Sequence, residues 1–319
     1  MTGYIGRYAP SPTGDLHLGN LLAAVAAWAR ARRARGRVLL RMEDLDTPRV
    51  VPGAAARIVC DLASLGLDFD AGPDRDDGRG PYVQSLCLPR YEAALDELRR
   101  AGRLFACTCS RKDLQRVASA PHQGDEGPPY PGTCRDAGHP FDDPGLPVSW
   151  RFVTEPGPEV IEDRLQGTFV QDVAREVGDF VVRRKDGIIA YHLAVVVDDA
   201  RQGITEVVRG RDLLASAPRQ AQLFRALGAK VPAFAHVPLW VGEDGERLAK
   251  RKGAGTVRAM LEQGVSPEAL LCKVGRALGV CRQGEEITAA RLQERLADDV
   301  LAVPTIRDDG PLREGAARL

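Results

Sequence analysis

A rigid turn near the N-terminus, RYAPSPTGDLHLGN (Arg7–Asn20), constrains the fold more than any other segment. Pro10 and Pro12 fix φ and remove two backbone donors, so the turn is neither helix nor central strand. A short apolar stretch precedes it, and an amphipathic segment begins at Leu18. His17 therefore falls at a predicted helix N-terminus, where unpaired N–H groups suit a phosphate. This order of strand, stiff turn and helix predicts a nucleotide site.

The segments that follow alternate between helical and strand patterns. Apolar residues at helical spacing and short buried runs alternate along the first hundred residues. We expect helices over Leu18–Arg35, Pro52–Leu65 and Pro89–Ala101, and a strand over Arg37–Met42. This alternation predicts an α/β fold with a parallel sheet.

The residue composition and the apolar pattern change from Phe105 onwards. Residues 118–148 carry many Pro, Gly, Asp and His, and residues 149–178 have the pattern of irregular β structure. A long stretch of this kind needs a local staple. We therefore expect an insertion over 102–178 between two halves of the sheet. The predicted parts are a first half (1–101), the insertion, a second half (179–257) and a helical C-terminal region (258–319).

The second half is predicted from its apolar runs. We expect the sheet to resume at Asp179–Arg183 and to continue through strands at Ile188–Val197, Ile204–Val208 and, as the last strand, Phe234–Val241. Helical patterns lie at Pro218–Leu227, Pro267–Leu278 and Ala289–Leu296. The residues from about Asp308 have the pattern of a frayed terminus.

Three of the seven cysteines cluster, namely Cys107, Cys109 and Cys134. In a reducing compartment, such clustering favours a metal site over a disulfide. The other four have apolar or helical surroundings and are interpreted as packed thiols: Cys60, Cys87, Cys272 and Cys281. The alternative is three ordinary thiols without a metal.

A basic loop follows the last predicted strand. Its cations are Arg247, Lys250, Arg251 and Lys252, and glycines flank it on both sides. Flexible glycines would let these cations close over a polyphosphate, for which Lys is a mobile point charge. The alternative is a solvated charge run on a surface turn.

The turn and the basic loop together resemble the two signatures of class I aminoacyl-tRNA synthetases. HLGN matches the first signature at His17 and Gly19, and RLAKR matches the second at Leu248 and Lys250. Asn20, Arg247, Ala249 and Arg251 depart from the usual residues. The resemblance implies a Rossmann-like catalytic domain with His17 and Lys250 as catalytic residues and Mg²⁺ bound with ATP. The implied ATP-binding residues are Pro10, His17, Gly19, Asn20, Arg247, Lys250 and Arg251.

Four further segments resemble the glutamyl branch of this family: RYAPSPTG, RMEDLD, AYHLAVVVDD and EVVRGRDLL. Two arginines, Arg7 and Arg209, can form forked bonds to a carboxylate, a geometry that Lys cannot provide. Glu43 can hold an α-ammonium group, Tyr191 supplies a hydroxyl and a wall, and Ser11 a further hydrogen bond. Taken singly, Glu43 and Arg209 could instead be members of surface ion pairs.

Length discriminates within the glutamyl branch. Full glutamyl-tRNA synthetases carry a much larger anticodon-binding region after the second signature than this sequence does. The chain therefore resembles the truncated paralogues, the glutamyl-queuosine tRNA(Asp) synthetases. That resemblance implies ATP-dependent activation of L-glutamate to glutamyl-adenylate and transfer of glutamate to the queuosine base in the anticodon stem-loop of tRNA(Asp).

Three alternatives to this function remain. One is a truncated glutamyl-tRNA synthetase that charges a tRNA 3′ end. The second is another nucleotidyltransferase with an HxGH signature, and the third is a non-catalytic RNA-binding protein derived from a synthetase. The identity of the tRNA that retains labelled glutamate, and of the end that carries it, separates most of these.

The cysteine cluster supports the resemblance independently. Cys107-Thr108-Cys109 and Tyr130 to Cys134 resemble the family's zinc site, which uses three cysteines and a tyrosine. The resemblance implies one structural Zn²⁺ per chain, because the cluster lies outside both ATP signatures. The spacer before Tyr130 is long, so His122 or His139 could be the fourth ligand instead.

The composition agrees with a soluble enzyme. Formal net charge is zero, which argues against a uniformly basic surface but leaves room for a local phosphate-binding patch. The sequence has neither an apolar run of about 20 residues nor a secretory signal pattern. We therefore expect a cytoplasmic protein without membrane contact, and the family resemblance suggests a monomer.

Overall fold

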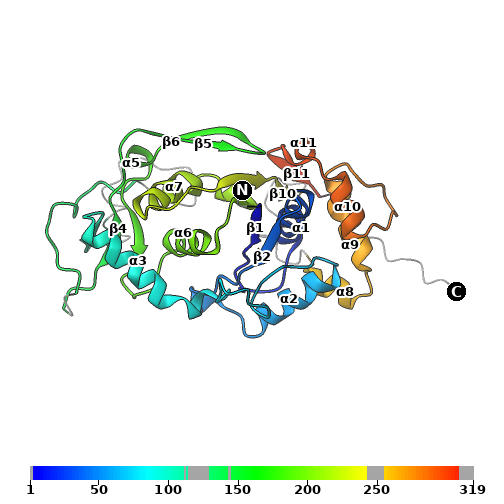
Figure 1. Ribbon diagram of the computed structural model, residues 1–319, viewed down its shortest axis with the longest axis horizontal. Helices are drawn as coiled ribbons and strands as arrows, with labels where there is room; N and C mark the ends of the chain where they lie inside the picture. The colour runs from blue at the N-terminus through cyan, green and yellow to red at the C-terminus, as the bar shows by residue number, and fades with distance from the viewer. Residues whose placement is uncertain (1–2, 111–112, 114–128, 143–144, 243–254, 309–319) are drawn as a thin grey trace.

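The computed structural model describes residues 3–110, 113, 129–142, 145–242 and 255–308. The molecule is elongated, and its N-terminal strand lies near the middle (Figure 1). At one end lies a small sheet with the helix that precedes it, and at the other end lie the C-terminal helices. This arrangement places the central sheet between two peripheral regions.

Among the described residues, six strands form the large sheet in the order β2-β1-β8-β9-β5-β6. Their bounds are β2 Arg37–Leu40, β1 Ile5–Tyr8, β8 Glu206–Gly210, β9 Ala233–Val237, β5 Pro158–Asp163 and β6 Gly167–Asp172. The first four strands run parallel, and β5 and β6 form an antiparallel hairpin that joins β9 at one register position, Asp163 opposite Phe234. The predicted α/β class and parallel sheet are confirmed.

Helix α1 (Leu18–Arg33) covers one face of this sheet. Its first two-thirds is rich in Ala and Leu, which favour helix, and its last turn carries Arg30, Arg32 and Arg33 beside the negative end of the helix dipole. Buried side chains of α1 join one core cluster with residues of β2 and of the C-terminal helices. The opposite face of the sheet packs on helix α7 (Ser216–Ala226) through Ala217 and Ala221.

A separate antiparallel sheet holds β3 (Leu104–Cys107), β4 (Ser149–Phe152) and β7 (Phe180–Arg183) in the order β3-β4-β7. The expectation that Asp179–Arg183 resumes the large sheet is therefore wrong, because β7 pairs with β4. The hairpin β5–β6 lies between these strands in sequence but joins the large sheet, through β9. The division of the chain into four parts stays a prediction, since sheet membership crosses its boundaries.

The predicted strand at Ile188–Val197 is wrong, because helix α6 spans Tyr191–Gln202. A continuous apolar run is ambiguous between a buried strand and a buried helix. The polar residues that end the run, Asp198, Asp199 and Gln202, recur at helical spacing, and all three are buried together. Gly203 ends the helix in the left-handed region with φ 69°, which glycine adopts without strain.

The predicted last strand, Phe234–Val241, is two strands that meet at Pro238. β9 ends at Val237, and β10 (Leu239–Val241) begins after the proline and forms a two-stranded parallel sheet with β11 (Thr305–Arg307). Proline has no N–H to donate to a ladder, which accounts for the break. Since β11 follows in the chain, Phe234–Val241 is also not the last strand.

The remaining helices confirm most of the helical predictions. Their bounds are α2 Ala54–Ser64, α3 Leu88–Arg100, α5 Val173–Glu176, α8 Val257–Glu262, α9 Pro267–Ala277, α10 Ala289–Arg295 and α11 Asp298–Leu301. Short 3-10 turns lie at Thr47–Arg49, Gln84–Leu86 and Arg211–Leu213. Within the described part of the chain, every helix is too short or too polar to cross a bilayer.

Candidate active site

A cleft of about 790 Å³ opens at the carboxyl ends of β1 and β8. Parallel strands bring their carboxyl ends to one edge of a sheet, where α/β proteins bind ligands, and the volume suits a nucleotide-sized molecule. Every candidate ATP or glutamate residue that the structure describes lines this cleft: Arg7, Pro10, Ser11, His17, Gly19, Asn20, Glu43, Tyr191 and Arg209. Residues distant in sequence thus meet in one site.

His17 is the N-cap of α1, as the sequence predicts. Its Nδ1 accepts a hydrogen bond from the Asn20 N–H at 3.2 Å, so the proton of the neutral ring lies on Nε2. The ring lies against the first turn of the helix, where a Cβ at residue 19 would come within 3.0 Å of the His17 Cε1 atom. Gly19 is therefore the residue that lets the ring adopt this position. The backbone N–H of Asn20 completes the cap.

The basic loop lies outside the described residues, and with it Arg247, Lys250 and Arg251. The chain returns to the described part directly beside the first signature. The Val257 N–H at the start of α8 donates to the Leu16 carbonyl at 2.7 Å, one residue before His17. An Arg258–Asp61 ion pair of 2.6 Å fixes α8 on α2. The described segment that follows the basic loop thus lies beside the predicted phosphate site.

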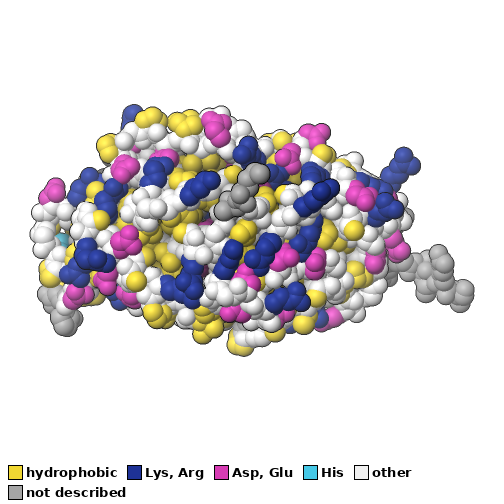
Figure 2. Space-filling model, in the orientation of Figure 1, with side chains coloured by type: hydrophobic (Ala, Val, Ile, Leu, Met, Phe, Trp, Pro, Cys, Tyr) yellow, Lys and Arg dark blue, Asp and Glu magenta, His cyan; other side chains and the backbone are white. Residues whose placement is uncertain are grey.

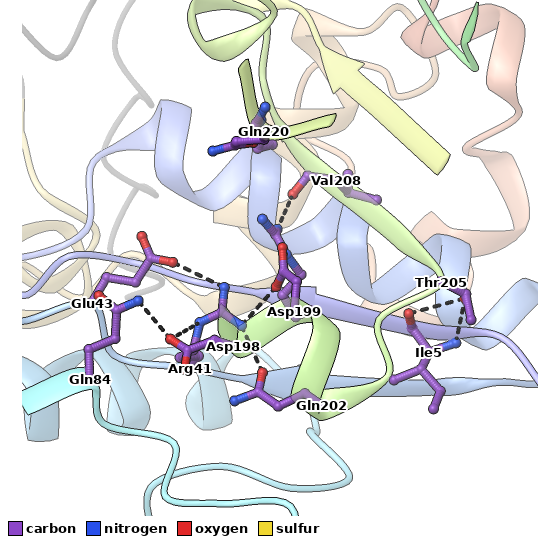
Figure 3. A network of polar contacts seen from close by, with 12 residues as sticks. Ile5, Arg41, Glu43, Gln84, Asp198, Asp199, Gln202, Thr205, Val208 and Gln220 are labelled. Atoms are coloured by element: carbon purple, nitrogen blue, oxygen red, sulfur yellow. Dashed lines mark hydrogen bonds and ion pairs between the residues drawn. The ribbon is translucent and has the colours of Figure 1, made fainter. Parts of the chain in front are cut away.

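Arg41, to which the sequence assigned no role, is the centre of a buried network (Figure 3). Its side chain is 1% exposed and donates to Asp199 at 2.8 Å and to Glu43 at 3.2 Å. A third donor bond reaches the Gln202 amide oxygen at 2.7 Å, and Asp198 lies 3.6 Å from the Arg41 Nε atom. Arg41 therefore fixes Glu43 at the cleft wall and joins β2 to α6.

Arg7 belongs to the same network through Asp199. Its Nε atom lies 3.2 Å from Asp199 Oδ1, and its Nη1 donates to the Val208 carbonyl at 3.1 Å. Burial favours the neutral acid, but the charges of Arg7 and Arg41 lower the pKa of Asp199. These contacts occupy Nε–H and one N–H of Nη1, so the second N–H of Nη1 and both of Nη2 have no contact with Asp199 or Val208.

Arg209 is also buried, but its hydrogen-bond partners differ from those of Arg41 and Arg7. Its Nη1 donates to the Tyr191 hydroxyl at 3.2 Å and to the Gln220 amide oxygen at 2.8 Å. Its Nε donates to His236 Nε2 at 3.0 Å, and its Nη2 to the Leu213 carbonyl at 3.2 Å. Every one of these acceptors is uncharged. Burial lowers the pKa of Arg209, and the smaller opposing effects of Tyr191 and Asp199 do not offset it.

The three clustered cysteines could hold a metal ion. The Sγ atoms of Cys107, Cys109 and Cys134 all lie within 4.8 Å of one another, and tetrahedral zinc thiolates need about 3.8 Å between sulfurs. Burial alone would raise the pKa of Cys134, but hydrogen bonds, first among them those from Thr108, lower it to about 6, which favours the thiolate that binds metals.

The hydroxyl of Tyr130 lies beside this cluster. It lies 3.5 Å from Cys107 Sγ and accepts the Cys134 N–H at 2.8 Å. Of the two alternative ligands, His122 lies outside the described residues. In the part of the chain that the structure describes, the three cysteines alone form a group of His, Cys, Asp or Glu ligand atoms close enough to share an ion, so His139 is not part of it.

Sequence reasoning missed the residues that support the site. Arg41, Asp198 and Asp199 lie within segments that resemble the family, yet they received no role, and His236 was not considered. A usable signal was present: charged residues at the end of apolar runs, in RVLLR and LAVVVDD, require buried partners. His236 lies within a predicted strand, so the sequence alone did not distinguish a role in the site from a buried neutral ring in the core.

Comparisons with known proteins agree with this geometry. Residues 5–299 match the family described as tRNA synthetases class I (E and Q), catalytic domain. The Glutamyl-Q tRNA(Asp) synthetase of Symbiobacterium thermophilum is 47% identical over 294 residues, which are 90% of each chain. That of Nocardia farcinica is 49% identical over 285 residues, 87% of this chain and 86% of its own.

A solved structure has the same fold. The glutamate-tRNA synthetase of Elizabethkingia anophelis superposes with a TM-score of 0.81 at 24% sequence identity. The match covers 96% of this chain and 68% of that one. At this level of identity the likeness supports the fold alone.

Proposed function

The chain belongs to the catalytic-domain family of class I tRNA synthetases for glutamate and glutamine, and on that premise we propose that it is a glutamyl-Q tRNA(Asp) synthetase. It activates L-glutamate with ATP and passes the glutamyl group to queuosine in the anticodon of tRNA(Asp). The observation that carries this proposal is the convergence of every described ATP or glutamate candidate residue on one cleft.

The amino-acid end of the cleft would be built by the two arginine networks. Arg209, held among uncharged acceptors, supplies the charge for a carboxylate, and Arg7 adds N–H donors of its Nη groups. Glu43, fixed by Arg41, binds the α-ammonium group, and Ser11 adds a hydrogen bond. The Tyr191 hydroxyl accepts a hydrogen bond from Arg209, and its ring forms a wall of this end of the cleft.

The nucleotide end would be built around the first signature. His17, with its proton on Nε2, donates to a phosphate oxygen beside the N–H groups of α1, while Pro10 and Gly19 shape the approach. Arg247, Lys250 and Arg251 would neutralise the triphosphate, and Mg²⁺ bound with ATP would add positive charge there. A glutamate carboxylate oxygen then attacks the α-phosphorus as the bond to pyrophosphate breaks. Positioning and charge stabilisation supply most of the catalysis.

We propose that the cysteine cluster is a structural Zn²⁺ site with Tyr130 as its fourth ligand. The distances among the thiols and the phenol fit a tetrahedral ion, and the site would join β3 to the segment around Cys134. Metal analysis should find one Zn²⁺ per chain. Tyr130→Phe should weaken zinc retention against a chelator, whereas His139→Ala should not; the reverse result would reassign the fourth ligand.

One experiment tests activation. Glutamate-dependent exchange of pyrophosphate into ATP should occur without any tRNA, and it should fall steeply in Lys250→Ala. Lys230→Ala is the matched control, because Lys230 is an exposed lysine outside the cleft, and it should leave the exchange unchanged. Unchanged exchange in Lys250→Ala would remove the basic loop from the mechanism.

A second experiment tests the acceptor. Labelled glutamate should be retained by tRNA(Asp) that lacks its 3′-terminal nucleotide, and not by intact tRNA(Asp) that lacks queuosine. The opposite pattern would identify a truncated glutamyl-tRNA synthetase, and no transfer to any tRNA would favour a nucleotidyltransferase.

The proposed tRNA substrate implies that the reaction takes place in the cytoplasm, away from membranes. The face in Figure 2 carries Lys and Arg across its middle with Asp and Glu among them, so a local patch rather than the net charge would meet RNA. We propose a monomer on family resemblance.

A further inference from the structure

A buried histidine and aspartate lie behind Arg209. His236 on β9 is 0% exposed, and Asp163 at the end of β5 is 6% exposed. The His236 Nε2 atom lies 3.0 Å from Arg209 Nε, and its Nδ1 lies 2.5 Å from Asp163 Oδ2. Three side chains from three strands thus form a line that ends at the cleft.

The chemistry of this line fixes the tautomer of the ring. The Nε–H of an arginine can only donate, so His236 Nε2 must accept and cannot carry a proton. The ring proton therefore lies on Nδ1, where it is donated to the Asp163 carboxylate. Burial lowers the pKa of His236 more than the bond to Asp163 raises it, so the ring is neutral near pH 7.

Three backbone donors hold Asp163 in this orientation. Its Oδ1 accepts from the N–H groups of Leu165, Gln166 and His236 at 3.0, 2.9 and 3.1 Å. Burial would raise the pKa of Asp163, but the interaction with His236 and these bonds lower it to about 2. The carboxylate is therefore ionised, and its second oxygen always faces the ring.

The imidazole keeps this carboxylate from touching Arg209. We propose that His236 is a positioning residue for the amino-acid substrate: held by Asp163 with its proton on Nδ1, it orients the Arg209 guanidinium without neutralising it, so that the charge stays available for a substrate carboxylate. With the side-chain carboxylate of glutamate at Arg209, the consequence is preference for glutamate over glutamine, since the uncharged amide of glutamine does not compensate the buried cation. This inference deepens the proposed function and rests on it.

Asp163→Asn is a sharp test because the direction of the new amide is determined. The three backbone N–H groups require an acceptor at Oδ1, so the amide oxygen takes that place and the NH₂ group faces His236 Nδ1. The ring must then accept on Nδ1 and carry its proton on Nε2, directly against the Nε–H of Arg209. An almost isosteric substitution should therefore displace Arg209 without opening a cavity.

The full-length chain is used for two measurements. In steady-state pyrophosphate exchange, Asp163→Asn should raise KM for glutamate about 10- to 100-fold, the range for losing a hydrogen bond to a charged group, and leave KM for ATP unchanged. The ratio of kcat/KM for glutamate over glutamine should fall. Glu162→Gln is the matched control: the neighbouring acid is exposed and bonds to Thr168, so these constants should stay at wild-type values.

The second measurement observes the ring itself. The sequence has five histidines, few enough for ¹⁵N-histidine spectra to resolve each ring, and His236→Gln assigns the signal. His236 should carry its proton on Nδ1 in the wild type and on Nε2 in Asp163→Asn. A wild-type ring protonated on Nε2 overturns the proposal, whether or not the variant folds. So does a switched tautomer with unchanged KM for glutamate.

Failure of this proposal is distinguishable from failure of the proposed function. Wild-type protein without glutamate-dependent exchange contradicts the function, whatever the tautomer of His236. Active wild-type protein, with a variant whose discrimination against glutamine is unchanged, contradicts only the positioning role.

Discussion

Two buried arginines beside the same cleft have opposite electrostatic surroundings: Arg209 lines the cleft, and Arg41 lies behind Glu43 of its wall. Arg41 is surrounded by carboxylates, with Asp199 at 2.8 Å, Glu43 at 3.2 Å and Asp198 at 3.6 Å. Within the described residues, Arg209 has only uncharged acceptors, the nearest of which is the Gln220 amide oxygen at 2.8 Å. One cation is fully compensated by the protein itself, and the other is not.

The difference separates a structural charge from a binding charge. Taking a guanidinium out of water costs several kcal/mol, which adjacent carboxylates recover in part. Around Arg41 this compensation is complete in the unliganded protein, so the network holds β2 and α6 together. Around Arg209 the compensation is left to a ligand, so binding a carboxylate recovers what folding did not. Substitutions at the two arginines should therefore have different effects.

The largest expected effect is on stability, at Arg41. Arg41→Met would leave Glu43 and Asp198 without their adjacent cation and Asp199 with Arg7 alone, and breaking a buried pair in this way costs about 3–5 kcal/mol. We expect the free energy of unfolding, measured by urea denaturation, to fall by that amount. A stability close to wild type would show that the carboxylates take up protons or water without penalty, and the network would then not be structural.

The next effect is on activity, at Arg209. Arg209→Met removes an uncompensated charge, so its stability cost should be much smaller than that of Arg41→Met, although it leaves neutral acceptors unpaired. Glutamate activation should fall about 30-fold or more in kcat/KM, as when one partner of a buried charge pair is lost. Pyrophosphate exchange and urea denaturation on the same preparation measure both. If stability fell as much as in Arg41→Met, the distinction between the two arginines would be lost.

The two networks also differ in what the sequence could predict. Arg209, Tyr191 and Glu43 were identified through segments that resemble a known family, and the cleft brings them together. His17 was placed at a helix N-terminus by two prolines and a following apolar stripe, and it is the N-cap of α1. Sequence motifs and local helix rules therefore suffice to predict residues that belong to a motif or to a helix terminus.

The supporting contacts could not be predicted in this way. Asp199 follows the predicted strand Ile188–Val197, which assigned it no side of the sheet; helix α6 brings it inward with Gln202. His236 and Asp163 meet because a hairpin from the middle of the chain joins the edge of the large sheet, which no local pattern encodes. Long-range strand order decides which polar side chains become partners.

The smallest expected effect is on the pH dependence of stability, which differs between His236 behind Arg209 and Asp199 beside Arg41. Because the pKa of His236 is lowered on folding, the unfolded chain binds this proton at a higher pH than the native chain, and stability falls as the pH drops below about 6.5. The slope for one group is at most about 1.4 kcal/mol per pH unit. Asp199, with a lowered pKa, stabilises the native chain above its unfolded pKa and loses that contribution only below about pH 4.

Comparison of the wild type with His236→Gln isolates this contribution, because all other titrating groups, including the buried His192, are common to both chains. The variant has no ring to protonate. We therefore expect the difference in unfolding free energy between wild type and variant to shrink as the pH is lowered from 7.5 to 5.5, measured by urea denaturation at each pH. A constant difference would mean that His236 titrates alike in both states, and the neutral ring that isolates Arg209 from Asp163 would then have no energetic basis.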